Sequence, residues 1–330
     1  MKSTIKTFKE DRNIFKKNID TFEEWTKVLK VNPMIEIIKK GLPSEIFILI
    51  RDLLEYDHSH TLYRLAEKAV FKQSGLHRIF HKGLKKYEDV ELNRHELFFN
   101  QLQRIHIIAD FGATNYLNPV KEEIIKLLEF QNDDGRFPLY YQHNAHACLQ
   151  LIKLGMEGNV MIDKCIKWVV KRQRDDGGWL HKNNTNSKSK AGSSKSCIWT
   201  TAEIALLLSK RSLFRNSNAN KKACEFLLNN LLKENSSSTL LTSEDSWNQL
   251  YISSDTQYMF SGGTLKVLEL LSLSGYNCSN KDYNRLYKWL LSQQLDSGFF
   301  PRTVSDLHIP DTLATIRALT VIKRTENKRD

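Results

Sequence analysis

Five side chains of types that bind metal ions or transfer protons stand near predicted helix starts: His143, His146, Cys197, His308 and Asp311. His143 and His146 are three residues apart, which places them on one face of a helix that begins before them. Imidazole, thiolate and carboxylate are all ligands that zinc accepts. Separated histidines at a helix start more often cap the helix or face water. We therefore predict no metal and no other cofactor, with a metal site assembled from these five residues as the alternative.

Positive charge is the second chemical feature of the chain. Lysine and arginine number 49 against 38 aspartates and glutamates, a formal net charge of +11, which favours anionic partners. The basic run LHRIFHKGLKK at 76–86 suggests peripheral contact with an anionic membrane, although such runs are usually solvated. The lysine-rich stretch 182–196 is either a flexible insert or a cover for a bound diphosphate. No nucleic-acid-binding motif is recognisable, so no nucleic acid is predicted as a partner.

Composition excludes several classes of protein. No apolar run approaches the roughly 20 residues of a membrane helix, and residues 1–13 turn charged before any apolar signal-peptide core appears. We therefore expect a cytoplasmic protein. The five cysteines contain no CxxC pair, so neither a disulfide framework nor a zinc knuckle is indicated.

Helix formers dominate the sequence, and strand-like alternation is scarce, so the predicted fold class is all-α. The clearest pattern lies in 43–72, where apolar residues recur at helical spacing from Ile46 to Leu54. We predict an N-terminal helical extension at 1–95 and a repeat domain at 96–330. One continuous domain from about residue 43 is the alternative.

An internal repeat organises the second part of the chain. The segments LLEFQNDDGRFP (127–138), VVKRQRDDGGWL (169–180) and LLSQQLDSGFFP (290–301) each end a helix with Gln and place Gly four residues later. An aromatic residue follows each glycine: Phe137, Trp179 and Phe299. Further helices follow at 144–155, 200–210, 262–275 and 311–323. Because one helical hairpin cannot bury its apolar face alone, the hairpins must stack.

The QRDDGGW motif at 173–179, with weaker copies at 131 and 294, resembles the repeat motif of squalene–hopene cyclases and related terpene cyclases. The β subunits of protein prenyltransferases share that fold. The resemblance covers about 100–325 and implies an α/α toroid, in which inner helices surround a central apolar cavity. Some polysaccharide lyases carry a similar turn, so the motif is more specific for fold than for reaction.

In such toroids the inner helices begin at the mouth of the cavity. The resemblance therefore implies that substrate-binding side chains lie at or near these starts. The candidates are Tyr141, His143, His146, Cys197, Trp199, Thr200, Tyr258 and Ser261, together with His308 and Asp311 in the last helix. The aromatic rings, Phe299 among them, would line the cavity and stabilise a carbocation.

The acid motif of the terpene cyclases is altered here. Those enzymes protonate their substrate with the middle aspartate of Asp-x-Asp-Asp. Asp311 matches the last aspartate, but Pro310 stands in the middle position and His308 in the first. Proline cannot donate a proton, so a catalytic form of this protein would use Asp311 and His308 as an acid/base pair. Asp311 also fits the N-cap of the following helix.

The zinc site of the prenyltransferases is missing at its usual place, where residues 261–264 read Ser-Gly-Gly-Thr. Three functions follow as hypotheses. The first is a terpenoid cyclase-like or prenyltransferase-like protein that acts on or binds an isoprenoid in an apolar central cavity. The second is a non-catalytic helical-repeat protein that binds a partner or ligand. The third is a carbohydrate-active toroid, for which acids are sparse near the expected rim.

Overall fold

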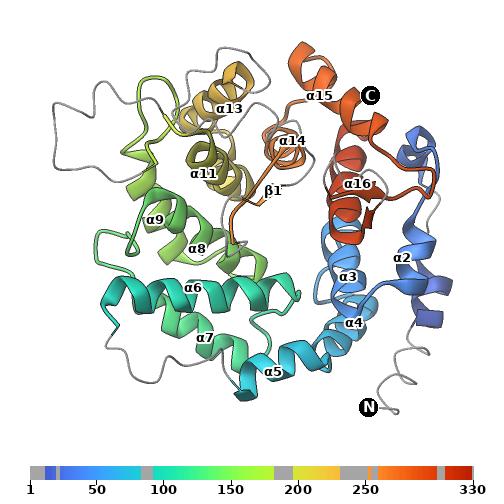
Figure 1. Ribbon diagram of the computed structural model, residues 1–330, viewed down its shortest axis with the longest axis horizontal. Coiled ribbons are helices and arrows are strands. Elements are labelled where there is room, and N and C mark those ends of the chain that lie inside the picture. The colour runs from blue at the N-terminus through green and yellow to red at the C-terminus, as the bar shows by residue number, and fades with distance from the viewer. Residues whose placement is uncertain are drawn as a thin grey trace.

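A computed structural model gives the fold of this chain. It describes residues 12–19, 23–82, 92–181, 196–230, 252–253, 259–302 and 309–328. These residues are predominantly helical, which confirms the helical fold class predicted from the sequence (Figure 1).

Five helices form what we call the inner row. They are α6 (Arg94–Asp110), α8 (Tyr141–Lys153), α11 (Ile198–Lys210), α14 (Thr264–Leu273) and α16 (Thr312–Glu326). Each packs against the next in this order. Residues on every side of α8, α11 and α14 are buried, as expected for helices that other helices surround.

Four helices form an outer row. They are α7 (Asn118–Leu128), α9 (Val160–Val170), α13 (Asn218–Asn230) and α15 (Lys281–Ser292). Each packs against the inner helix that precedes it in the chain, with the short α12 (Ser212–Arg215) between α11 and α13. Helix α15 is typical, because it buries Tyr283, Leu286, Tyr287 and Leu290 on one face and exposes the other.

The N-terminal third lies beside the last helix of the chain. Its elements are η1 (Glu24–Val28), α2 (Met34–Lys40), α3 (Pro43–Ile48), the π-helical turn η2 (Leu49–Leu53), α4 (Thr61–Phe71) and α5 (Ser74–Lys82). Helix α16 packs against η1, α3 and η2, and Lys323 Nζ donates to the Leu53 carbonyl at 3.2 Å (Figure 1). One hydrophobic core runs through the N-terminal helices and both rows.

The three Gln-to-Gly corners make the same pair of hydrogen bonds. In each corner one side-chain amide donates to the carbonyl of its own glycine and to a backbone carbonyl near the start of another helix. The distances are 2.6 and 2.9 Å for Gln131 (to Gly135 and Met161), 2.9 and 2.8 Å for Gln173 (to Gly177 and Ala219), and 2.8 and 2.8 Å for Gln294 (to Gly298 and Val31). Each corner is therefore fastened to a helix outside its own hairpin.

The corner glycines are required by both conformation and space. Their φ angles are 93° for Gly135, 87° for Gly177 and 85° for Gly298, in the left-handed region that favours glycine. A Cβ atom at Gly177 would also lie 2.4 Å from the carbonyl oxygen of Lys222 in α13. The corner backbone at Gly177 thus lies in direct contact with the backbone of α13.

The second residue after each corner glycine is a buried aromatic that bonds to the inner row. The N–H groups of Phe137, Trp179 and Phe300 donate to Asn144 Oδ1, Thr201 Oγ1 and Thr315 Oγ1, at 2.7, 3.1 and 2.8 Å. In the third corner this residue is Phe300, whereas the sequence had pointed to Phe299. Phe299 is half-buried one position earlier and packs against the core.

Short antiparallel ladders stand beside two of the inner helices. Strand β1 (Ile252–Ser253) pairs with β2 (Ser261–Gly262), just before α14. Strand β3 (Phe300–Pro301) pairs with β4 (Pro310–Asp311), just before α16. None of the described helices combines the length and apolar composition needed to cross a bilayer.

We predict that Gly177→Ala lowers the free energy of unfolding by about 2 kcal/mol or more, because alanine is strained at this φ and its Cβ meets backbone. Urea unfolding followed by circular dichroism measures the change. Gly158→Ala is the matched control, since no atom lies within 4 Å of the added Cβ there. Equal unfolding midpoints for the two variants would contradict the role given to the corner.

Candidate functional site

The predicted site residues that the structure describes lie in several different surroundings. His308 and Tyr258 lie outside the described residues. Trp199 and Thr200 are buried in the first turn of α11. The Tyr141 ring lies 5.3 Å from the ring of Trp168 in α9, so it faces the outer row. Of the described members of the predicted set, His146 contacts residues of both neighbouring inner helices, α6 and α11.

Asp311 is the N-cap of α16. Its Oδ1 accepts a hydrogen bond from the Ala314 N–H at 2.7 Å, which satisfies one of the free amides of the first turn. This is the capping role that its position before an apolar helix predicts. His308, the predicted acid/base partner of Asp311, lies outside the residues that the structure describes.

His143 lies in an aromatic cluster at the start of α8. Its ring centroid is 5.0 Å from Phe260, 5.7 Å from Tyr140 and 5.9 Å from Phe99. Burial, assisted by the positive charge that His146 and His181 can carry, lowers the pKa of His143 to about 3. The imidazole is therefore neutral at physiological pH.

His146 belongs to a chain of polar side chains that crosses the inner row. We call His106, His146, Glu203 and Lys266 the central network; they come from α6, α8, α11 and α14. His146 Nδ1 lies 2.8 Å from Glu203 Oε1, and His146 Nε2 lies 3.3 Å from His106 Nδ1. On the other side of Glu203, Lys266 Nζ bonds Glu203 Oε2 and also donates to the Ser261 carbonyl at 2.7 Å. Four consecutive inner helices are thereby linked through their side chains.

Glu203, at the middle of the central network, is ionised although it is buried. Burial alone would raise the pKa of Glu203, but Lys266 and His146 outweigh that effect and lower it to about 2. His106 connects the network to Asp110, 3.4 Å away, which in turn pairs with Lys153 at 3.0 Å. Burial lowers the pKa of His106 to about 4.

The geometry of His146 favours a structural role over a catalytic one. Its side chain is only 4% exposed, and both ring nitrogens already have protein partners, because Gln150 Nε2 also lies 3.1 Å from Nε2. A general base needs one nitrogen within reach of a substrate proton. The contacts of His146 instead hold the inner helices to one another.

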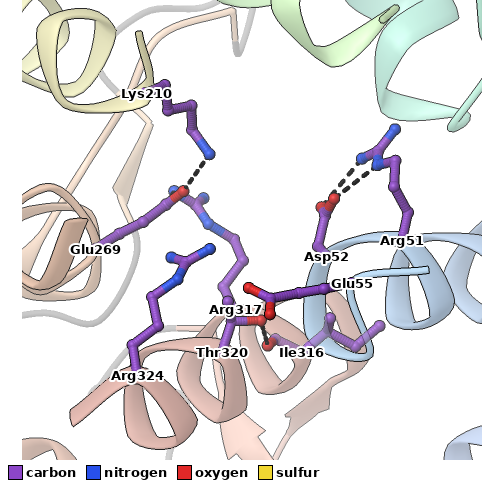
Figure 2. Close-up of a pocket in the computed structure, with 9 residues that line it drawn as sticks. All are labelled: Arg51, Asp52, Glu55, Lys210, Glu269, Ile316, Arg317, Thr320 and Arg324. Atoms are coloured by element: carbon purple, nitrogen blue, oxygen red, sulfur yellow. Dashed lines mark hydrogen bonds and ion pairs between the residues drawn. The ribbon is translucent and has the colours of Figure 1, made fainter. Parts of the chain in front are cut away.

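A cavity of about 170 Å³ lies where the later turns of three inner helices meet η2. We call it the charged pocket. Its lining residues are Arg51, Asp52, Glu55, Lys210, Glu269, Ile316, Arg317, Thr320 and Arg324 (Figure 2). Seven of these nine side chains are ionisable, so the pocket suits a polar ligand.

Ion pairs fix most of the charged side chains of this pocket. Glu269 lies 2.8 Å from both Lys210 Nζ and Arg317 Nη2. Burial tends to raise the pKa of Glu269. The two cations lower it by more than burial raises it, so the pKa lies well below the usual range. Asp52 accepts two hydrogen bonds from Arg51, at 2.6 and 3.0 Å. Both carboxylates are therefore ionised and neutralised by neighbours.

Arg324 and Glu55 differ from the other charged residues of the pocket. Arg324 Nη1 is buried and has no hydrogen-bond partner among the described residues. Glu55 has a φ of 58°, a left-handed conformation that is costly for a residue with a Cβ atom. Such strain is more common at functional sites than elsewhere.

The charged positions were visible in the sequence but were not singled out by it. Glu203 stands in TTAEIALLLSK, and Lys266 and Glu269 stand in TLKVLELLSL. Most of the surrounding residues in both segments are apolar. A charge on a helix that is apolar all round must be buried and therefore paired. That rule would have marked all three residues, although not their partners.

Comparison with known proteins adds no assignment, since neither a family model nor a curated protein sequence matches the chain. Among the described residues, no three His, Cys, Asp or Glu side chains gather closely enough to hold a metal ion. Burial raises the pKa of Cys197, which disfavours the thiolate that zinc requires.

We predict that Glu203→Gln lowers the free energy of unfolding by about 3–5 kcal/mol, because it leaves Lys266 buried without its counter-charge. The double variant Glu203→Gln with Lys266→Met should recover at least about half of that loss. Urea unfolding of Glu203→Gln, Lys266→Met and the double variant measures these changes in the free energy of unfolding. Glu24→Gln, at a side chain that is 84% exposed, is the control and should change stability by less than about 0.5 kcal/mol. A cycle with no coupling between Glu203 and Lys266 would contradict the network.

Acid should destabilise the fold through its buried histidines. In the unfolded chain His106 and His143 protonate near pH 6.5, whereas in the fold their pKa values are about 4 and 3. The unfolded state therefore binds more protons between these limits, and stability falls as pH falls below about 6.5, by at most about 1.4 kcal/mol per pH unit for each histidine. Urea unfolding between about pH 7 and pH 5 measures the slope, and His143→Gln should make it shallower. An unchanged slope in that variant would show that His143 does not contribute.

Proposed function

We propose that the chain is an α/α toroid of helical hairpins, in which the N-terminal helices complete the ring. The support comes from the third corner. Gln131 and Gln173 bond near the starts of α9 and α13, the outer helices that follow. Gln294 has no later outer helix to bond, and it makes the same bond to Val31, just before α2. Lys30 reinforces this contact, because its N–H donates to Gln294 Oε1 at 2.7 Å.

We further propose that the protein is a non-catalytic helical-repeat protein that binds a polar ligand through its charged centre. The observation that carries this proposal is the occupancy of the middle of the inner row by ionised side chains, in the central network and in the charged pocket. An isoprenoid chain requires apolar walls. It would have to displace or cover ions whose desolvation is costly.

The ionisation of the central carboxylates argues against cyclase-type acid catalysis. An acid that protonates an alkene must stay neutral at the working pH, which requires a raised pKa. The pKa values of Glu203 and Glu269 are lowered instead. Asp311 uses one oxygen to cap α16. Neither Glu203 nor Glu269 is held in the neutral form that the reaction needs.

An isoprenoid ligand remains a second candidate at the opposite end of the inner helices, where α8 begins. The observation that favours it is the group of rings around His143: Phe99, Tyr140 and Phe260. Aromatic faces stabilise carbocations and pack well against prenyl chains. Peripheral contact with an anionic membrane through 76–86 also remains a proposal that rests on the basic sequence.

Turnover and binding of isoprenoids test the two candidates against each other. We expect squalene and farnesyl diphosphate to yield no new hydrocarbon product by gas chromatography. We also expect farnesol, which lacks a charged group, to give no binding signal by calorimetry. A product that disappears in Asp311→Ala would overturn the non-catalytic proposal. Farnesol binding that is lost in Phe260→Ala would favour the isoprenoid candidate.

A further inference from the structure

We propose that the charged pocket is a binding site for a phosphate-type anion, either free phosphate or the phosphate group of a small phosphorylated molecule. The inference rests on the proposed function in one respect only, namely that the centre takes a polar ligand. It names the chemistry of that ligand and the residues that recognise it.

The first argument is the charge balance of the pocket. Four cationic side chains line it, Arg51, Lys210, Arg317 and Arg324, against the three carboxylates Asp52, Glu55 and Glu269. The formal excess is therefore 4 − 3 = +1. Because Asp52 and Glu269 are already bonded to cations, their repulsion of an incoming anion is reduced.

The second argument is the unused hydrogen-bonding capacity of the cations. Arg324 Nη1 is a buried donor on a charged group without a partner among the described residues, a state that costs free energy unless a ligand or water satisfies it. Lys210 carries three donors on Nζ and can bond an anion while it keeps Glu269. Both side chains line the same cavity.

The third argument is the direction from which the donors arrive. Arg51 comes from η2, Lys210 from the last residue of α11, and Arg324 from the last turns of α16. In Figure 2, Lys210 reaches Glu269 from above, Arg317 and Arg324 extend toward it from below, and Arg51 with Asp52 lies across the open middle. A tetrahedral anion can accept hydrogen bonds from several such directions, and the guanidinium group matches phosphate oxygens well.

Size selects between kinds of phosphorylated ligand. The cavity of about 170 Å³ is smaller than the 300–1,000 Å³ of typical small-molecule sites. It therefore has room for a phosphate group but not for a large molecule, whose remainder would have to extend into solvent. The C-terminal ends of α11 and α16 add partial negative charge, so the side chains must supply the attraction.

Calorimetric titration with inorganic phosphate tests the site. We expect binding to the wild-type chain that weakens at least about tenfold in Arg324→Gln, the effect of losing one charge-assisted hydrogen bond. Arg285→Gln is the matched control, because it removes the same charge from a half-exposed position on α15 and should change affinity less than about twofold. Arg324→Lys, which keeps the charge, should fall between the two.

Each outcome decides the proposal. No heat and no thermal stabilisation of the wild-type chain by phosphate would overturn it, as would equal affinities for Arg324→Gln and Arg285→Gln. If Arg324→Gln fails to fold, Arg324→Lys supplies the comparison. Titration with glycerol phosphate, with glycerol as control, distinguishes the sources, since tighter binding than free phosphate points to a phosphorylated molecule. If the chain binds neither phosphate nor farnesol, the phosphate site is wrong, but the proposal that the protein is non-catalytic is unaffected.

Discussion

The two N–H donors of a single glutamine amide determine how consecutive hairpins are placed. One donor is taken by the carbonyl of the corner glycine, four residues later, which fixes the orientation of the side chain. The other can then reach only the backbone of the neighbouring helix, at 2.8–2.9 Å in the three corners. Because the glycine next to this bond leaves no room for a Cβ atom, each corner lies in close contact with the segment that it bonds, namely α9, α13 or the residues just before α2. The corner also positions an inner helix, because the backbone N–H of the corner aromatic donates a hydrogen bond to a side chain on that helix.

Placing the inner helices in this way forces their charged side chains together. Lys266 and Glu203 lie on helices that are buried on every side, so neither can reach water, and each is stable as an ion only because the other is there. Glu269 is also mostly buried, and it is paired with Lys210 and Arg317, whose side chains are partly exposed. A centre built from such pairs keeps its carboxylates ionised. Such a centre does not provide the neutral acid that carbocation chemistry requires, and it is the basis on which we propose a charged ligand.

Much of the fold could be predicted from the sequence, because its signals are local. The Gln-to-Gly spacing and the apolar helices need no knowledge of distant residues. The register of the third corner was misjudged, since Phe299 and Phe300 are both aromatic and only the bond to Thr315 distinguishes them. The central network was missed for a different reason. Glu203 and Lys266 are 63 residues apart, and their pairing depends on how α11 packs against α14. The family resemblance directed attention to residues that could bind an isoprenoid, so it pointed to His146 but not to Glu203 or Lys266.

Helix α16 connects the capped start at Asp311 to the charged pocket. At its start, Pro310 pairs with Pro301 in the β3–β4 ladder, and neither residue has an N–H or an ionisable group. Asp311 is committed to the first turn as a cap. From its second turn to its last, the same helix contributes Arg317 and Arg324 to the cavity that Lys210 and Arg51 also line. The start of α16 therefore serves stability through its cap, whereas the residues from its second turn onward supply cations to the pocket for which we propose a ligand.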